Sequence, residues 1–163
     1  MALGGFQTRS KAACQFGAQS DLTPDRERRK AMAKKRVFIS YDYDRDRHYK
    51  NLLVAWDKNK EFDFSFYDES VDVSVDSNKA EVIKRVISSR IRESTHFLCI
   101  VGKYTHKSVW IAWEIDKALE VKTKIVAVKT EKDNLTPGGL YRAGAAWALS
   151  FTFEAIKQAL DKA

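Results

Sequence analysis

The stretch His96-Phe97-Leu98-Cys99-Ile100-Val101, followed by Gly102, is the most continuously apolar run of the chain. A short run of this kind that ends at glycine is typical of a strand buried on both faces of a parallel sheet. We therefore expect this strand at the centre of the sheet. Residues 37–41 and 125–128 have the same character, and residues 145–149 predict a short final strand.

The remaining strand and the helices are predicted from periodicity. Phe62, Phe64 and Phe66 recur at every second position, which indicates a strand with one less buried face, as at a sheet edge. Apolar residues at helical spacing follow each predicted strand except the one at residues 125–128. That strand is followed by a loop that contains Pro137-Gly138-Gly139 and leads to the last strand. The predicted inward positions are Tyr49, Leu52, Leu53 and Trp56 in the first helix, Ile83, Val86, Ile87 and Ile91 in the second, Ile111, Ile115, Ala118 and Leu119 in the third, and Ile156 and Leu160 in the last.

Strands that alternate with helices favour right-handed crossovers and a parallel sheet covered on both faces. We predict an α/β, flavodoxin-like three-layer sandwich over residues 35–163, whose five-stranded parallel sheet has the order 2-1-3-4-5. In this architecture ligands gather at the carboxyl ends of the strands.

Residues 1–34 are predicted to lie outside this domain. They contain few apolar residues and no sustained period, so we expect them to be disordered. An alternative is that they are a misannotated extension, because Arg28-Arg29-Lys30-Ala31-Met32 can be encoded by a bacterial ribosome-binding sequence and a start codon. Residues 1–36 hold nine Lys and Arg against three acids, whereas residues 37–163 hold twenty against nineteen. The net charge of +7 therefore belongs mostly to the extension, and we do not expect nucleic acid as a partner.

Several other classes are not favoured. No apolar run approaches the roughly 20 residues that span a bilayer, so we expect a soluble protein with no membrane partner. The two cysteines and three histidines show no metal-ligand spacing, so we assign no metal and expect a reducing cytoplasm. Neither a Gly-rich dinucleotide fingerprint nor a P-loop is present.

Polar residues leave two of the predicted strands at their carboxyl ends. Ser40, Tyr41 and Asp42 follow the first strand, where backbone amides can meet a phosphate. Asp68 and Ser70 occupy the matching end of the second strand. Each group is either part of a ligand site or an ordinary polar turn.

Three motifs in order carry a family resemblance. They are Val37-Phe38-Ile39-Ser40-Tyr41, then Phe66-Tyr67-Asp68-Glu69-Ser70, then Gly102-x-x-Thr105-x-x-Ser108-x-Trp110-x-x-x-Glu114-Ile115. Together they resemble the TIR family over about residues 36–163. The last motif looks particularly like the TIR-like proteins of bacterial Thoeris anti-phage defence. The polar loop after Tyr67 differs from that of many TIR domains, because it lacks the proline that they carry there.

The resemblance implies that Glu114 is the catalytic carboxylate of an NAD glycohydrolase or cyclase. A carboxylate suits this role because breaking the bond between nicotinamide and ribose develops positive charge on the ribose. The alternative is a solvated surface acid that contacts Lys117 on the same helix. Trp110 is predicted either to provide an aromatic wall of the site or to pack in the core. Ser108 is predicted to cap the helix, to contact ligand hydroxyls, or both.

We therefore expect a domain that binds and cleaves NAD as its substrate and needs no cofactor. The product would be ADP-ribose or a cyclic ADP-ribose-type signal in bacterial anti-phage defence, sensed by a downstream effector. The alternative is a non-catalytic signalling module that binds itself or other TIR-like domains, because membership of the family alone does not establish chemistry.

Overall fold

The computed structural model describes Met1 and residues 34–58, 64–66 and 80–163. By its internal contacts the chain divides into two units, residues 1–32 and 33–163, and the second contains the secondary structure described below. The prediction for the N-terminal extension lies almost wholly outside the described residues, as do Asp68 and Ser70.

The sheet has the predicted architecture. Its five strands are all parallel and lie in the order β2-β1-β3-β4-β5, which confirms the flavodoxin-like arrangement. Every residue of β3 is buried, as expected of the central strand, and β2 lies at an edge. The strands are β1 Lys35–Ser40, β2 Phe64–Phe66, β3 His96–Val101, β4 Lys124–Lys129 and β5 Ala146–Ala148.

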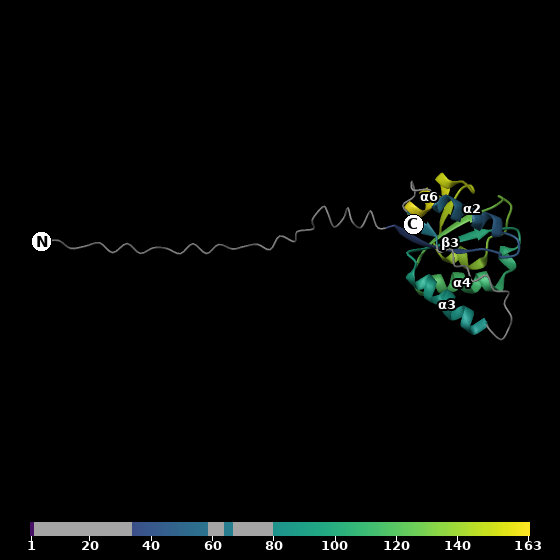
Figure 1. The fold of residues 1–163 in the computed structure, drawn as a ribbon, viewed down its shortest axis with the longest axis horizontal. Coiled ribbons are helices and arrows are strands. Elements are labelled where there is room, and N and C mark those ends of the chain that lie inside the picture. The colour runs from purple at the N-terminus through teal and green to yellow at the C-terminus, as the bar shows by residue number, and fades with distance from the viewer. Residues whose placement is uncertain (2–33, 59–63, 67–79) are drawn as a thin grey trace. The chain divides into compact units, whose positions relative to one another are not determined.

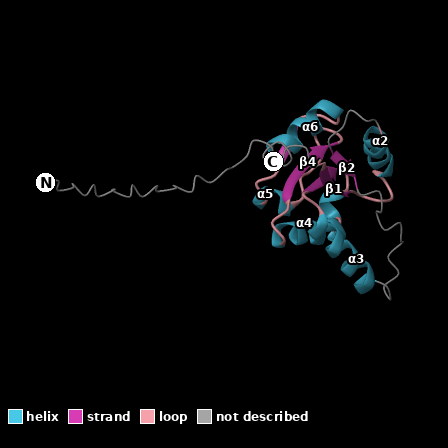
Figure 2. Cartoon of the chain, turned by 60° about the vertical axis from the view of Figure 1, so that its left-hand side comes forward, coloured by secondary structure: helices cyan, strands magenta, loops and turns pink. Residues whose placement is uncertain are grey.

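Helices cover both faces of the sheet, which confirms the three-layer sandwich. Figures 1 and 2 show α2 and α6 on one face and α3 and α4 on the other. Each face encloses its own apolar core, one around Leu53 and Leu160, the other around Ile87 and Ile115. The helices are α2 Arg47–Asp57, α3 Ala80–Glu93, the 3-10 helix η2 Thr105–Lys107, α4 Val109–Glu120, α5 Gly138–Arg142 and α6 Phe153–Lys162.

Three details of the prediction were wrong. Leu52 and Val86, predicted to face inward, are 41% and 38% exposed. Each lies beside the stripe of its helix that meets the sheet, so its neighbours Leu53 and Ile87 occupy the core instead. Residues 138–142, predicted as loop, form α5. A Cβ at Gly139 would come within 2.8 Å of Ile115, so glycine allows this helix to approach α4 closely.

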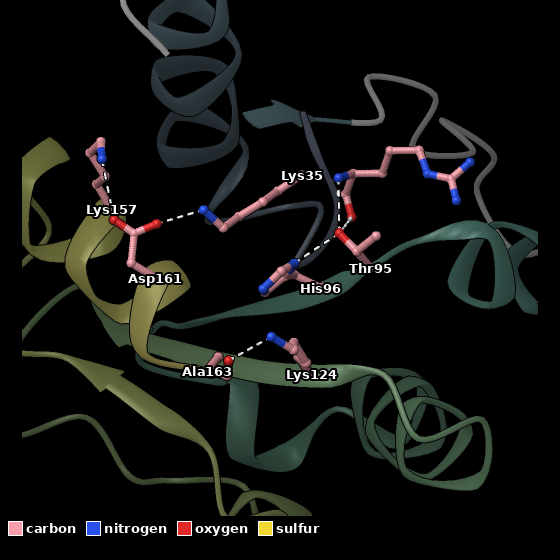
Figure 3. Close-up of polar contacts among 8 residues, drawn as sticks. Lys35, Thr95, His96, Lys124, Lys157, Asp161 and Ala163 are labelled. Atoms are coloured by element: carbon pink, nitrogen blue, oxygen red, sulfur yellow. Dashed lines mark hydrogen bonds and ion pairs between the residues drawn. The ribbon is translucent and has the colours of Figure 1, made fainter. Parts of the chain in front are cut away.

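The amino ends of the strands carry a network of ion pairs and hydrogen bonds (Figure 3). Lys35 Nζ lies 2.5 Å from Asp161 Oδ1, and Lys157 Nζ lies 3.2 Å from Asp161 Oδ2. Thr95 Oγ1 and His96 Nδ1 are 2.8 Å apart. Burial, together with the nearby charges of Lys124 and Lys35, lowers the pKa of His96 to about 4. The first of these ion pairs ties α6 to the sheet at its amino edge.

Candidate active site

Glu114 lies inside the protein, against the carboxyl end of β1. Only 5% of the residue is exposed. Ser40 Oγ donates a hydrogen bond to Glu114 Oε2 at 2.5 Å, and Trp110 Nε1 donates to Glu114 Oε1 at 3.2 Å. Each carboxylate oxygen therefore has its own donor.

Strand alternation places Ser40 opposite Glu114. Val37 and Ile39 belong to the core under α2 and α6, whereas Phe38 belongs to the core under α3 and α4. Because successive side chains of a strand point to opposite faces, Ser40 shares the face of Phe38 and meets α4. Tyr41 belongs to the core on the other face.

Burial controls the proton affinity of Glu114. Loss of solvent raises its pKa from 4.5 to about 7, and the hydrogen bonds from Ser40 and Trp110 oppose that rise without cancelling it. No Lys or Arg of the described segments forms an ion pair with it. Both protonation states are therefore populated near neutral pH, as suits a group that handles charge or protons.

The alternative reading of Glu114 as a solvated surface acid was wrong. Lys117, its predicted partner, pairs instead with Glu120 at 2.5 Å. Trp110 packs against the core, with its ring 5.3 Å from that of Trp113, and its indole bonds Glu114. Its role as an aromatic wall of the site stays a prediction. The capping role of Ser108 is confirmed, since its hydroxyl accepts from the backbone N–H of Ile111 at 3.2 Å. A ligand role for Ser108 stays a prediction.

Asp42, at the start of the loop after β1, is engaged within that loop. Its side chain accepts from the backbone N–H of Asp44 at 3.2 Å and pairs with Arg45 at 3.3 Å. The structure brings Ser40, Trp110 and Glu114 into direct contact, places Ser108 at the start of the same helix, and leaves Asp42 in the loop after β1.

Three positively charged side chains lie beside the loop that contains Asp42, around the exposed ring of Tyr104. The guanidinium of Arg45 lies 4.6 Å from the ring centroid, and the ammonium groups of Lys103 and Lys107 lie 5.7 and 5.9 Å from it. Sequence reasoning missed this cluster, because Arg45 is far from the others along the chain. We call these four residues the cationic rim.

Two buried polar residues near the site were also missed. Asp46 is 6% exposed and Thr105 is fully buried, and they face each other at the carboxyl edge. Thr105 was noted only as part of the Gly-x-x-Thr motif. Cys99 lies beside Ser40 in the parallel register. Burial raises the pKa of the Cys99 thiol far above its usual range, and the nearby carboxylates of Glu114 and Asp46 raise it further.

A separate depression of about 500 Å³ opens beside α5 and β5. It contains none of the predicted site residues. Among the described residues, no group of His, Cys, Asp and Glu side chains is arranged to hold a metal ion. The helices of the described segments are too short or too polar to cross a membrane. The depression is lined by Lys129, Thr136, Leu140, Tyr141, Gly144, Ala145 and Trp147.

Comparison with solved structures supports the fold. The CMP N-glycosidase BcmB of Clostridium botulinum is similar with a TM-score of 0.54 and 18% identity, over 78% of this chain and 98% of that one. The TIR domains of the activated Roq1 resistosome match with a TM-score of 0.47 and 20% identity, over 61% of this chain. The match spans 59% of the Roq1 chain.

Comparison of sequences identifies the family. No curated protein matches the chain. The sequence profile of the family described as "Thoeris protein ThsB, TIR-like domain" matches residues 38–135, which is more than half of the chain and includes the end of β1 with Ser40, all of α4 and Glu114. This protein therefore belongs to the Thoeris ThsB TIR-like domain family.

Proposed function

We propose that this domain binds NAD and cleaves the bond between nicotinamide and ribose. The observation that carries the proposal is the buried carboxylate of Glu114, held by Ser40 and Trp110 with a pKa of about 7 at the carboxyl edge of the sheet. A structural acid at this place would be exposed or paired with a cation, because an unpaired buried carboxylate is costly. Groups kept at such a cost are candidates for function.

The reaction follows from what a carboxylate can do. As the bond between C1′ of the ribose and the nicotinamide nitrogen breaks, the electron pair leaves with nicotinamide and positive charge develops on the ribose. Ionised Glu114 stabilises that charge or accepts a hydrogen bond from a ribose hydroxyl. Attack by water at C1′, with loss of one proton, gives ADP-ribose. Attack by a nucleophile of the same nucleotide gives a cyclic product instead.

The other predicted residues would hold the substrate around this carboxylate. The ribose takes the place of one donor, Ser40 or Trp110, on a Glu114 oxygen. The cationic rim would neutralise the pyrophosphate, and the backbone of Tyr41 and Asp42 together with the Ser108 hydroxyl would complete the contacts. Asp68 and Ser70, which lie outside the described residues, remain proposed contacts on the basis of sequence alone.

The family description motivates the biological role that we propose. The nucleotide product would act as a signal in bacterial anti-phage defence, made in the cytoplasm and sensed by an effector encoded elsewhere. Neither a bound cofactor nor a metal enters this scheme, because NAD is the substrate.

The test is turnover of NAD by the full chain, followed as nicotinamide release and product masses, beside Glu114→Gln. We expect the variant to lose about 10²–10³-fold or more in kcat, the usual cost of removing a group that stabilises transition-state charge. Glu120→Gln, an exposed acid of the same helix, is the matched control and should keep wild-type turnover. Equal turnover by the wild type and Glu114→Gln would remove Glu114 from this role.

The second candidate is a non-catalytic module that self-associates. It is favoured by apolar side chains exposed near β4, α5 and β5, with Tyr141 76%, Leu135 63% and Leu149 98% exposed. Such exposure is typical of an interaction surface. Sedimentation of the wild type and Tyr141→Ser across concentrations tests this candidate. A dimer weakened by the substitution, in a protein that releases no nicotinamide, would favour the module over the enzyme.

A further inference from the structure

Two buried polar side chains at the carboxyl edge have no role in the reaction above. Thr105 Oγ1 accepts the backbone N–H of Gly102 at 2.8 Å, and the same hydroxyl lies 3.4 Å from the carbonyl of Ile100 and 3.5 Å from Asp46 Oδ2. Asp46 and Thr105 are 59 positions apart in the chain. Their contact therefore joins the loop after β1 to the segment between β3 and α4.

The contact requires glycine at position 102, because there is no room for a side chain beside Asp46. A Cβ built on Gly102 would collide with the carboxylate of Asp46. Glycine leaves the space that the carboxylate fills, so the Gly-x-x-Thr motif acquires a physical reason: glycine makes room for Asp46, and threonine bonds both the glycine backbone and the carboxylate.

The side chain of Asp46 makes this contact instead of the capping hydrogen bond expected at its position. It occupies the N-cap position of α2, where Asp is favoured because its side chain can bond the free N–H groups. Yet its side chain makes no capping hydrogen bond. Burial and the neighbouring charge of Asp42 also raise its pKa, partly offset by His48, Thr105 and Arg45. A buried carboxylate that forgoes capping is retained against a cost in stability.

We propose that Asp46, Thr105 and Gly102 form a latch that positions the two hydrogen-bond donors of Glu114. On one side, Asp46 N–H donates to the carbonyl of Asp42 at 2.8 Å, only two residues after Ser40. On the other side, the carbonyl of Thr105 accepts from Ser108 N–H at 3.2 Å, and Ser108 caps the helix that carries Trp110 and Glu114. Asp46 and Thr105 are positioning residues, since neither touches Glu114.

The first experiment rests on the proposed function and measures NAD turnover by the full chain. Thr105→Val replaces the hydroxyl by a methyl group of similar size, and Gly102→Ala displaces the Asp46 carboxylate without changing any charge. We expect each to lower kcat about tenfold to a hundredfold, because a misplacement of about 1 Å at reacting groups has this effect. KM should change less than kcat, since every charged group of the cationic rim is retained.

Thr105→Ser, which restores the hydroxyl, is the matched control and should recover most of the wild-type kcat. A folded Thr105→Val or Gly102→Ala protein with wild-type kcat would overturn the latch. The Gly102→Ala protein should fold, because the group it meets is the end of an Asp side chain.

The second experiment does not depend on catalysis. The carboxyl of Glu114 is titrated by carbon-detected NMR in the wild type, Gly102→Ala, Thr105→Val and Thr105→Ser. Loosening the latch should weaken the hydrogen bonds from Ser40 and Trp110 and so raise the midpoint of Glu114 by about one pH unit, except in the serine variant. An unchanged midpoint in folded Gly102→Ala would overturn the proposal. If the wild type releases no nicotinamide and the variants still show these shifts, the proposed enzymatic activity is refuted and the latch is retained.

Discussion

The two edges of the sheet hold carboxylates in opposite circumstances. At the carboxyl edge, Glu114 is 5% exposed and receives hydrogen bonds from two neutral donors. At the amino edge, the side chain of Asp161 is 44% exposed and receives two lysines, Lys35 and Lys157. Both side chains carry the same functional group, yet burial raises the pKa of one and ion pairing lowers that of the other.

The difference distinguishes Glu114, the proposed site residue, from Asp161, which stabilises the fold through ion pairs. For Asp161, partial burial acts to raise the pKa, but the bonds from Lys35 and Lys157 outweigh it and the net pKa falls, so the ionised form is favoured. For Glu114 no cation among the described residues compensates for burial, so the folded protein disfavours its charge. Burial of one carboxylate without a cation has a cost in stability that the other does not have, which supports our proposal that Glu114 is the functional one.

The largest expected effect comes from removing the charge of Glu114. Its folded pKa of about 7 lies above the ordinary 4.5, so the associated stability is complete below pH 4.5 and is lost as pH rises to 7. Relative to wild type, Glu114→Gln should gain about 3 kcal/mol of unfolding free energy between about pH 4 and pH 8. Denaturant unfolding at both values measures this. A constant difference between variant and wild type would contradict the buried charge.

His96 is expected to show an effect of the same size with the opposite sign in pH. Its folded pKa of about 4 lies below the ordinary 6.5, so its contribution is present above pH 6.5 and is lost as pH falls to 4. His96→Gln should therefore lose less stability than wild type on acidification, by about 2 kcal/mol at pH 4.5 and about 3 kcal/mol well below pH 4. Parallel unfolding curves at about pH 7 and pH 4.5 are the measurement. If both proteins weaken equally, His96 is not buried as a neutral ring.

The donors of Glu114 should show smaller effects. Ser40→Ala and Trp110→Phe each remove a hydrogen bond to the carboxylate, so each should raise the pKa of Glu114 further. Each should also cost about 1–2 kcal/mol above the pKa and less below it, because bonds to a charged acceptor are the stronger ones. NMR titration and unfolding at two pH values test both points. A lowered midpoint in either variant would show that the removed group does not donate to Glu114.

The smallest effect is predicted at the amino edge. Asp161→Asn removes two partly exposed ion pairs, which should cost at most about 1 kcal/mol. Added salt should shrink the difference, since exposed pairs are screened. Thermal unfolding at low and high salt measures it. A loss as large as that expected at the carboxyl edge would erase the distinction between the two edges.

Much of the candidate site could be predicted from sequence, and the rest could not for a definite reason. The contact of Trp110 with Glu114 joins residues four apart on one helix, which periodicity places on one face. The contact of Ser40 with Glu114 spans 74 positions and depends on how β1 packs beneath α4. Local spacing carries no information about such a pairing. The same holds for Asp46 and Thr105.

The sequence by itself determined the alternation of the five strands with the four longer helices, the central place of β3 and the family, because periodicity and motif spacing are local properties of the chain. Only the tertiary structure decided that Glu114 is buried, that Lys117 pairs elsewhere and that Asp46 faces Gly102. Burial and the pKa shifts it causes arise from segments far apart in the chain that exclude water from one another. The motif therefore identified the carboxylate, and packing sets its charge.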